Sequence, residues 1–130
     1  MIDTKHSTLQ RSIGIIHKPL TSSNIFFASQ YVLPGMRAKG GRSIINFSSI
    51  SYMMGKAGYP TYITANARIM GMTRSVAREF GPDNIRVNAI APGWVLTKKQ
   101  LDKWATPDGL NAHLERQCIK NHLKSDDIVG

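Results

Sequence analysis

Two hydroxyl-bearing residues, Ser49 and Tyr62, have the types and spacing that acid/base chemistry on an oxygen atom requires. Ser49 follows a short apolar run, and Tyr62 stands thirteen residues later at the start of a long helical pattern. Asn66 lies one helical turn beyond Tyr62, so their side chains are expected on one face of that helix. Because α/β sheets hold ligands at the carboxyl ends of their strands, both hydroxyls are expected to face one crevice.

The segments around these residues alternate between helical and strand patterns. Residues 43–48 and 85–90 are β-branched and apolar, as in strands of a parallel sheet that are buried on both faces. Residues 22–38 and 61–80 carry apolar residues at helical spacing. This order predicts an α/β fold of the doubly wound kind, in which parallel strands are joined by right-handed crossovers.

Capping and turn residues refine the two predicted helices. Ser22 or Ser23 is expected to cap the first helix, and Gly35 with the pair Gly40 and Gly41 is expected to mark its end and a turn. Gly81 predicts the end of the second helix, with the glycine in the left-handed conformation. The apolar face of the first helix is expected to hold Phe26, Phe27, Gln30, Tyr31 and Leu33.

The tail of the chain is predicted to be helical in parts. Thr106 can cap a helix that opens with Pro107, and Cys118 is expected on the buried apolar face of that helix. Asp126 and Asp127 predict the start of another helix, because acidic residues favour a helix N-terminus.

The composition restricts the class of protein. The chain has 130 residues, 42% of them hydrophobic, which suits one domain or part of one and excludes a disordered linker. The net charge of +9 comes from dispersed basic residues without interleaved aromatic residues, which favours solvated surface over nucleic-acid binding. The longest uncharged run, 19–36, contains two prolines and is too polar for a membrane span. The single cysteine fits a reducing, cytoplasmic compartment, and no metal-ligand spacing is evident.

With these segments in place, the sequence resembles the short-chain dehydrogenase/reductase family. The resemblance runs from about residue 26 to residue 130, which leaves 1–20 irregular and unplaced and makes 21–130 a partial domain of that family. The stretch from Trp94 to Lys124 looks most like members that oxidise sugars or polyols. The matching segments are 43–49, Tyr59–Tyr62, Gly71–Arg74, Ile85–Asn88 and Pro92–Thr97.

The resemblance implies a role for each site residue. Tyr62 would exchange a proton with the oxygen of a small alcohol or carbonyl substrate, and Ser49 would hydrogen-bond that oxygen. Trp94 and Met53 would contact the substrate, with generic packing as the alternative for both. The cofactor would be NAD or NADP, held along the segment that contains Pro92, Gly93, Val95 and Thr97.

The sequence departs from the family pattern four residues after the tyrosine, where the family usually has a lysine. Asn66 stands there, and an amide can hydrogen-bond a ribose hydroxyl but brings no charge. A fixed positive charge favours the phenolate form of a tyrosine, so its loss should slow proton transfer. Arg68 and Lys56 are the nearest other cations in sequence, and the family's catalytic asparagine position falls near Thr21.

The glycine-rich turn that binds the cofactor pyrophosphate is absent from the sequence, so the resemblance implies a Rossmann-like fold without its N-terminal cofactor-binding half. Two functions are therefore weighed. The first is a truncated oxidoreductase that transfers hydride between NAD(P) and a small alcohol, carbonyl or sugar. The alternative is an inactive fragment or pseudoenzyme that acts by association, as a homo-oligomer or with a relative, through helices 22–38 and 61–80.

Overall fold

The computed structural model describes residues 21–55 and 57–129. The segment 1–20, which the sequence predicts to be irregular, lies outside the described residues, as does Lys56. The chain divides into two units, one that runs to Ala91 and one that spans Pro92–Gly130. Each unit is described by itself.

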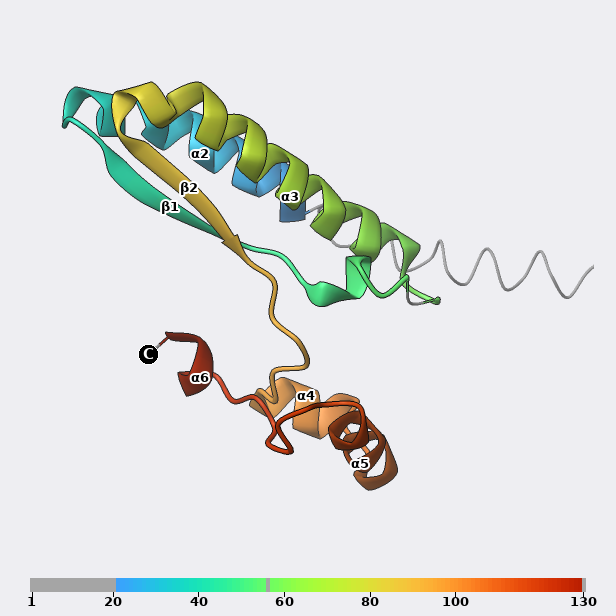
Figure 1. Ribbon diagram of the computed structural model, residues 1–130. Coiled ribbons are helices and arrows are strands. Elements are labelled where there is room, and N and C mark those ends of the chain that lie inside the picture. The colour runs from blue at the N-terminus through green and yellow to red at the C-terminus, as the bar shows by residue number, and fades with distance from the viewer. Residues whose placement is uncertain (1–20, 56, 130) are drawn as a thin grey trace, which may run out of the picture. The chain divides into compact units, whose positions relative to one another are not determined.

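The first unit is built on two parallel strands that carry two helices (Figure 1). Strand β1 (Arg42–Phe47) pairs with strand β2 (Ile85–Ile90) in a continuous parallel register. Helix α3 (Pro60–Phe80) connects the two strands, and helix α2 (Thr21–Ala38) precedes them and lies beside α3. The predicted α/β order is confirmed, with element boundaries within one residue of the expected ones.

The hydrophobic core lies between the sheet and the two helices. Leu33 of α2 and both Ile85 and Val87 of β2 are buried there. The partly buried residues that pack against them are Met36, Ile44, Val76, Ala77 and Phe80. Because side chains alternate along a strand, the residues between these inward positions face the other side of the sheet.

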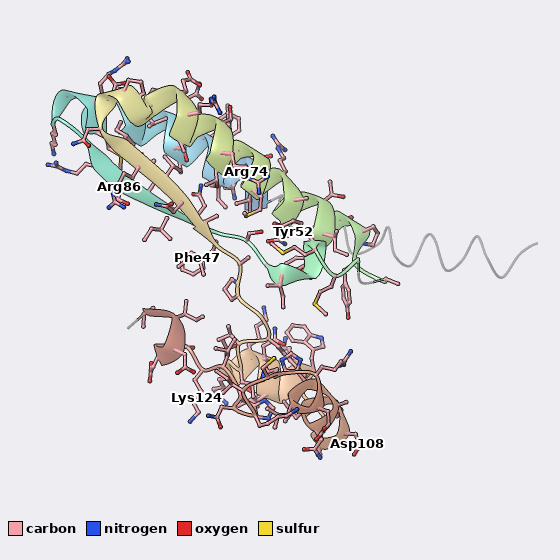
Figure 2. The ribbon with its side chains drawn as sticks, viewed as in Figure 1. Phe47, Tyr52, Arg74, Arg86, Asp108 and Lys124 are labelled. Atoms are coloured by element: carbon pink, nitrogen blue, oxygen red, sulfur yellow. The ribbon has the colours of Figure 1, made fainter. Side chains whose placement is uncertain are left out.

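The second face of the sheet is exposed in the described part of this unit. Ile45 and Phe47 retain 57% and 50% of their accessible surface, and Phe47 points away from the helices (Figure 2). The expectation that both strands are buried on both faces is therefore wrong. The reason is that α2 and α3 lie on the same face, so the apolar runs are covered from one side alone.

Helix α2 packs through a different face from the one that its aromatic residues predict. Ser29 and Leu33, one turn apart, are buried, whereas Phe26, Phe27 and Tyr31 are 42%, 63% and 87% exposed. The helix begins at Thr21, so Ser22 and Ser23 lie inside it and the predicted cap is wrong.

The glycine pair after α2 closes the helix as predicted, whereas Gly35, which was also expected to mark the helix end, lies inside α2. The N–H groups of Gly40 and Gly41 donate to the carbonyl oxygens of Arg37 and Met36 at 3.1 Å each. Both glycines have positive φ, 75° and 111°, a region that other residues rarely adopt. At Gly41 a Cβ atom would also collide with the backbone of Asn84, so glycine is required there.

The end of α3 is predicted correctly, but the left-handed residue is not the glycine. Gly81 has φ −56° and ψ −42°, and a short 3₁₀ turn, η3 (Gly81–Asp83), continues from the helix. Asn84 then takes the left-handed conformation with φ 59°. Pro82 fits the first turn of the 3₁₀ segment, and asparagine is one of the residues that tolerate the left-handed region.

The second unit consists of three short helices: α4 (Lys98–Lys103), α5 (Pro107–Glu115) and α6 (Asp126–Val129). The hydroxyl of Thr106 accepts a hydrogen bond from the N–H of Gly109 at 3.2 Å, which confirms the predicted start of α5. The predicted start of α6 is also confirmed. Cys118 lies beyond the end of α5 and is exposed, so its predicted burial is wrong. No helix among the described residues is long and apolar enough to cross a membrane.

Candidate active site

Ser49 occupies the turn that follows β1, at the carboxyl end of the strand. It is the N-cap of a 3₁₀ turn, η2 (Ile50–Tyr52), and its backbone is extended, with φ −155° and ψ 144°. Its Oγ accepts hydrogen bonds from the N–H of Ser51 at 3.3 Å and from the hydroxyl of Ser51 at 2.9 Å. The residue is half-buried.

Tyr62 lies in the first turn of α3, and its side chain is 52% exposed. The start of α3 needs no charged residue, because Pro60 supplies a backbone angle suited to the first helical position. The turn η2 packs against α3, so Ser49 and Tyr62 belong to two adjoining elements of one unit.

Asn66 follows Tyr62 by one turn but is 5% exposed, and its Nδ2 donates to the backbone oxygen of Tyr62 at 2.8 Å. The amide that stands at the usual lysine position therefore bonds within its own helix. Arg68 is exposed, and its guanidinium lies 3.5 Å from the hydroxyl of Ser23 on α2. Lys56, the other alternative cation, lies outside the described residues.

Side-chain hydrogen bonds join the end of β1 and the residue that follows it to α3. The hydroxyl of Ser48 donates to the backbone oxygen of Asn66 at 3.0 Å. Asn46 donates from Nδ2 to the hydroxyl of Thr73 at 2.9 Å, and that hydroxyl donates to the oxygen of Ile69 at 2.8 Å. Because buried polar groups need partners, these bonds fix the position of α3 relative to β1.

The sequence analysis did not predict these hydrogen bonds, although one residue type pointed to them. Asn46 is a polar residue at an inward position of a strand whose neighbouring inward position is Ile44. A polar group at such a position requires a hydrogen-bonding partner from the element packed on the sheet. A threonine on the inner face of helix 61–80 was the available partner, and Thr73 supplies it.

The loop between η2 and α3 carries the predicted substrate residue Met53. Its side chain is 63% exposed, and that of Met54 is 57% exposed. The loop turns through Gly55 and Gly58, with φ of 58° and 93°. An exposed, unbranched side chain of this kind is free to adapt to a ligand surface.

The predicted cofactor segment, residues 92–97, belongs to the second unit and is half-buried up to Leu96. Val95 forms a parallel bridge with Leu123, whose carbonyl oxygen accepts from the N–H of Leu96 at 2.8 Å. Thr97 caps α4, because its hydroxyl accepts from the N–H of Gln100 at 3.3 Å. Helix α4 was not anticipated, although Thr97 carries the same capping signal as Thr106.

Trp94 joins two of the three helices of the second unit, α4 and α5, to this segment. Its Nε1 donates to the side-chain oxygen of Gln100 on α4 at 3.0 Å. Its ring meets the ring of His113 on α5 edge to face, with centroids 5.3 Å apart. The indole therefore has a packing role, whereas Trp104 is 57% exposed.

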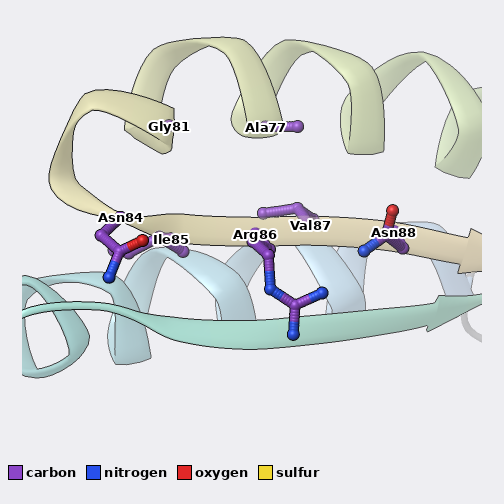
Figure 3. A pocket seen from close by; sticks show the side chains of 7 residues that line it. All are labelled: Ala77, Gly81, Asn84, Ile85, Arg86, Val87 and Asn88. Atoms are coloured by element: carbon purple, nitrogen blue, oxygen red, sulfur yellow. The ribbon is translucent and has the colours of Figure 1, made fainter.

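One ion pair and two hollows of the first unit are formed by residues other than Ser49 and Tyr62. Arg37 and Asp83 form an ion pair at 2.7 Å, and the hydrogen bond to Asp83 raises the pKa of the Arg37 guanidinium. One shallow hollow runs along β2 beside α3, where Ala77 faces Val87 and Arg86 points away from the helix (Figure 3). A second is lined by Gln30, Leu33, Pro34, Arg37, Ala38 and Phe80. Among the described residues, no group of three potential metal ligands is present.

The comparisons with known proteins agree with this arrangement. Residues 15–130 match the family model described as "Enoyl-(Acyl carrier protein) reductase". The chain is 48% identical over 107 residues to "Probable galactose dehydrogenase GalD" of Rhizobium meliloti, a match that covers 82% of this chain and 42% of that protein. It is 45% identical to D-xylose 1-dehydrogenase of Caulobacter vibrioides, covering 82% of this chain and 43% of the relative.

Solved structures give the same assignment. A 7 alpha-hydroxysteroid dehydrogenase complexed with NADH and 7-oxo glycochenodeoxycholic acid superposes with a TM-score of 0.75 at 32% identity, covering 79% of this chain and 40% of that one. The chain thus spans about two fifths of the length of the relatives that it matches. By its family model, its sequence relatives and its fold, the chain belongs to the short-chain dehydrogenase/reductase family.

Proposed function

We propose that residues 21–130 form the catalytic part of an NAD(P)-dependent oxidoreductase that acts on a small alcohol or carbonyl compound, with sugars as the substrate class. One observation carries the proposal. Ser49 at the carboxyl end of β1 and Tyr62 in the first turn of α3 lie on adjoining elements, which the bond from Ser48 to Asn66 holds together. The sugar preference is supported by relatives that are named for galactose and D-xylose.

In this proposal Tyr62, which is 52% exposed, exchanges a proton with the substrate oxygen through its phenol hydroxyl. Ser49 donates a hydrogen bond to the same oxygen and so places it beside the phenol. The partly exposed loop that carries Met53 contacts the substrate from one side. The bond between Ser48 and Asn66 keeps the helix start, and with it Tyr62, at a fixed distance from the strand end.

The fit of the nicotinamide cofactor to these residues is incomplete. The irregular segment from Pro92 to Val95 offers backbone groups and partly exposed side chains, which suits the edge of a flat ring. Asn66 does not fit the role of a ribose ligand, because its Nδ2 bonds to Tyr62 and its side chain is 5% exposed. When bound, the nicotinamide would supply the hydride chemistry, and the chain would supply proton exchange and orientation.

A second function is favoured by the aromatic surface of α2. Phe26, Phe27 and Tyr31 form a group that stays largely exposed among the described residues of the unit. Large exposed apolar groups mark interaction sites, so this surface supports association with a second copy or a relative. In this alternative the chain is an inactive fragment or pseudoenzyme, and α2 and α3 carry its function as a binding surface.

Turnover assays separate the two functions. The purified chain is incubated with D-galactose or D-xylose and either NAD or NADP, and reduced cofactor is followed by its absorbance. The enzyme proposal predicts turnover that Tyr62→Phe abolishes and that Tyr31→Phe, which removes an exposed phenol on α2, leaves unchanged. Absence of turnover in a folded chain, together with a dimer that Phe27→Ser converts to a monomer, would support the association function.

A further inference from the structure

We propose that Ser51 is a positioning residue that makes Ser49 a hydrogen-bond donor toward the substrate oxygen. The inference rests on the proposed function, in which Ser49 holds that oxygen. Ser51 is not among the site residues that the family resemblance implies for this chain.

The geometry of η2 places both polar groups of Ser51 on a single atom. Ser49 caps the turn, so the N–H of Ser51 is directed at Ser49 Oγ, 3.3 Å away. The hydroxyl of Ser51 reaches the same Oγ at 2.9 Å. Two donors therefore converge on one side-chain oxygen.

The donor and acceptor capacity of a hydroxyl decides what remains for a third partner. A serine hydroxyl has one proton to donate and two lone pairs to accept. The N–H of Ser51 can only donate, so it occupies one lone pair of Ser49 Oγ. The hydroxyl of Ser51 occupies the other, and the proton of Ser49 is then what the residue can offer to a further partner. A carbonyl or alkoxide oxygen is a partner that needs such a proton.

The surrounding contacts hold Ser51 in this arrangement. The N–H of Met53 donates to the oxygen of Ile50 at 2.9 Å and closes the turn. Ser51 is half-buried, and η2 packs against α3. Without the Ser51 hydroxyl, a lone pair of Ser49 Oγ is vacated, and the Ser49 side chain gains freedom to rotate about χ1.

The rotamer of Ser49 tests the proposal without any need for turnover. Three-bond couplings between the α and β protons of Ser49 are measured by NMR in the unmodified chain, in Ser51→Ala and in Ser51→Thr. One rotamer is expected in the unmodified chain and in Ser51→Thr, which keeps the hydroxyl, and averaged couplings are expected in Ser51→Ala. Ser43→Ala, at an exposed position of β1, is the matched control and should change nothing. A single Ser49 rotamer that persists in Ser51→Ala would overturn the proposal.

Kinetics give the second readout. Ser51→Ala should lower kcat about tenfold with little change in KM, and Ser51→Thr should restore it, because one hydrogen bond that orients the donor is lost and regained. An unchanged kcat in Ser51→Ala would also overturn the proposal. If the unmodified chain shows no turnover, the proposed function is contradicted, and the rotamer of Ser49 still decides the role of Ser51.

Discussion

The hydroxyl of Ser48 donates a 3.0 Å hydrogen bond to the backbone oxygen of Asn66, eighteen residues further along the chain. The bond joins Ser48, which directly follows β1, to the second turn of α3. Asn66 in turn donates from its side chain to the backbone oxygen of Tyr62. The backbone that carries the phenol is thus linked to the strand end that carries Ser49 by two consecutive bonds.

Removal of the Ser48 hydroxyl should loosen this link. Ser48→Ala is expected to lower the free energy of unfolding by about 1 kcal/mol, the usual contribution of one hydrogen bond. Urea denaturation measures the loss, and Ser43→Ala, at an exposed position of the preceding strand β1, serves as the control. Equal stabilities of the two variants would show that the bond contributes nothing.

The buried pair of Asn46 and Thr73 predicts a larger effect. Thr73→Val keeps the shape of the side chain but leaves the amide of Asn46, which is 5% exposed, without its acceptor. The free energy of unfolding should fall by about 1–3 kcal/mol, the cost of an unsatisfied buried polar group.

Two further variants check the origin of that loss. Thr64→Val makes the same change on the exposed side of α3 and should alter stability by less than about 0.5 kcal/mol. Asn46→Val combined with Thr73→Val should cost less than the sum of the two single changes, because no polar group is left unpaired. Additive losses in urea denaturation would contradict the assigned bond.

The glycine pair after α2 offers a matched test of backbone constraint. Gly41→Ala should destabilise the chain by about 3 kcal/mol or more, because φ is 111° and the new Cβ meets the backbone of Asn84. Gly40→Ala, with φ 75° and open space around it, should cost about 1 kcal/mol. Thermal or urea unfolding that gave the two variants the same stability would refute the close approach of Gly41 to Asn84.

A positive charge at position 66 should assist proton transfer. Asn66→Lys is expected to raise kcat about tenfold, because a nearby ammonium stabilises the phenolate form of a tyrosine. Asn66→Met, which has a similar stem and no charge, is the control and should not raise kcat. Both variants lose the bond to Tyr62, so a gain shared by both would point to relief of that bond rather than to charge.

The sequence predicted the helices and strands of the first unit and their order, because the periodicity of apolar residues indicates which element forms. It did not predict which face of α2 is buried. Phe26, Phe27 and Tyr31 outweigh Leu33 in size, but the position of the sheet selects the face of Ser29 and Leu33. Apolar content alone does not say where a helix meets its neighbours.

The site residues were placed on the expected elements, but their polar contacts were not foreseen. Ser49 and Tyr62 follow from the strand end and the helix start, which are local signals. The bonds from Ser48 to Asn66 and from Asn46 to Thr73 join residues 18 and 27 positions apart. Such pairs depend on the position of α3 relative to β1. The packing of the core determines that position, so no local sequence pattern predicts these bonds.

Cofactor binding is the most direct test of the central claim that this chain carries a nicotinamide-dependent proton-transfer site. The Trp104→Phe variant leaves Trp94 as the single tryptophan, and its emission is followed as NADH is added. Saturable quenching is expected, and Gly93→Val should weaken it because the valine adds bulk to the proposed cofactor segment. Emission that stays unchanged up to millimolar NADH, in a chain shown by circular dichroism to be folded, would contradict nicotinamide binding by this chain.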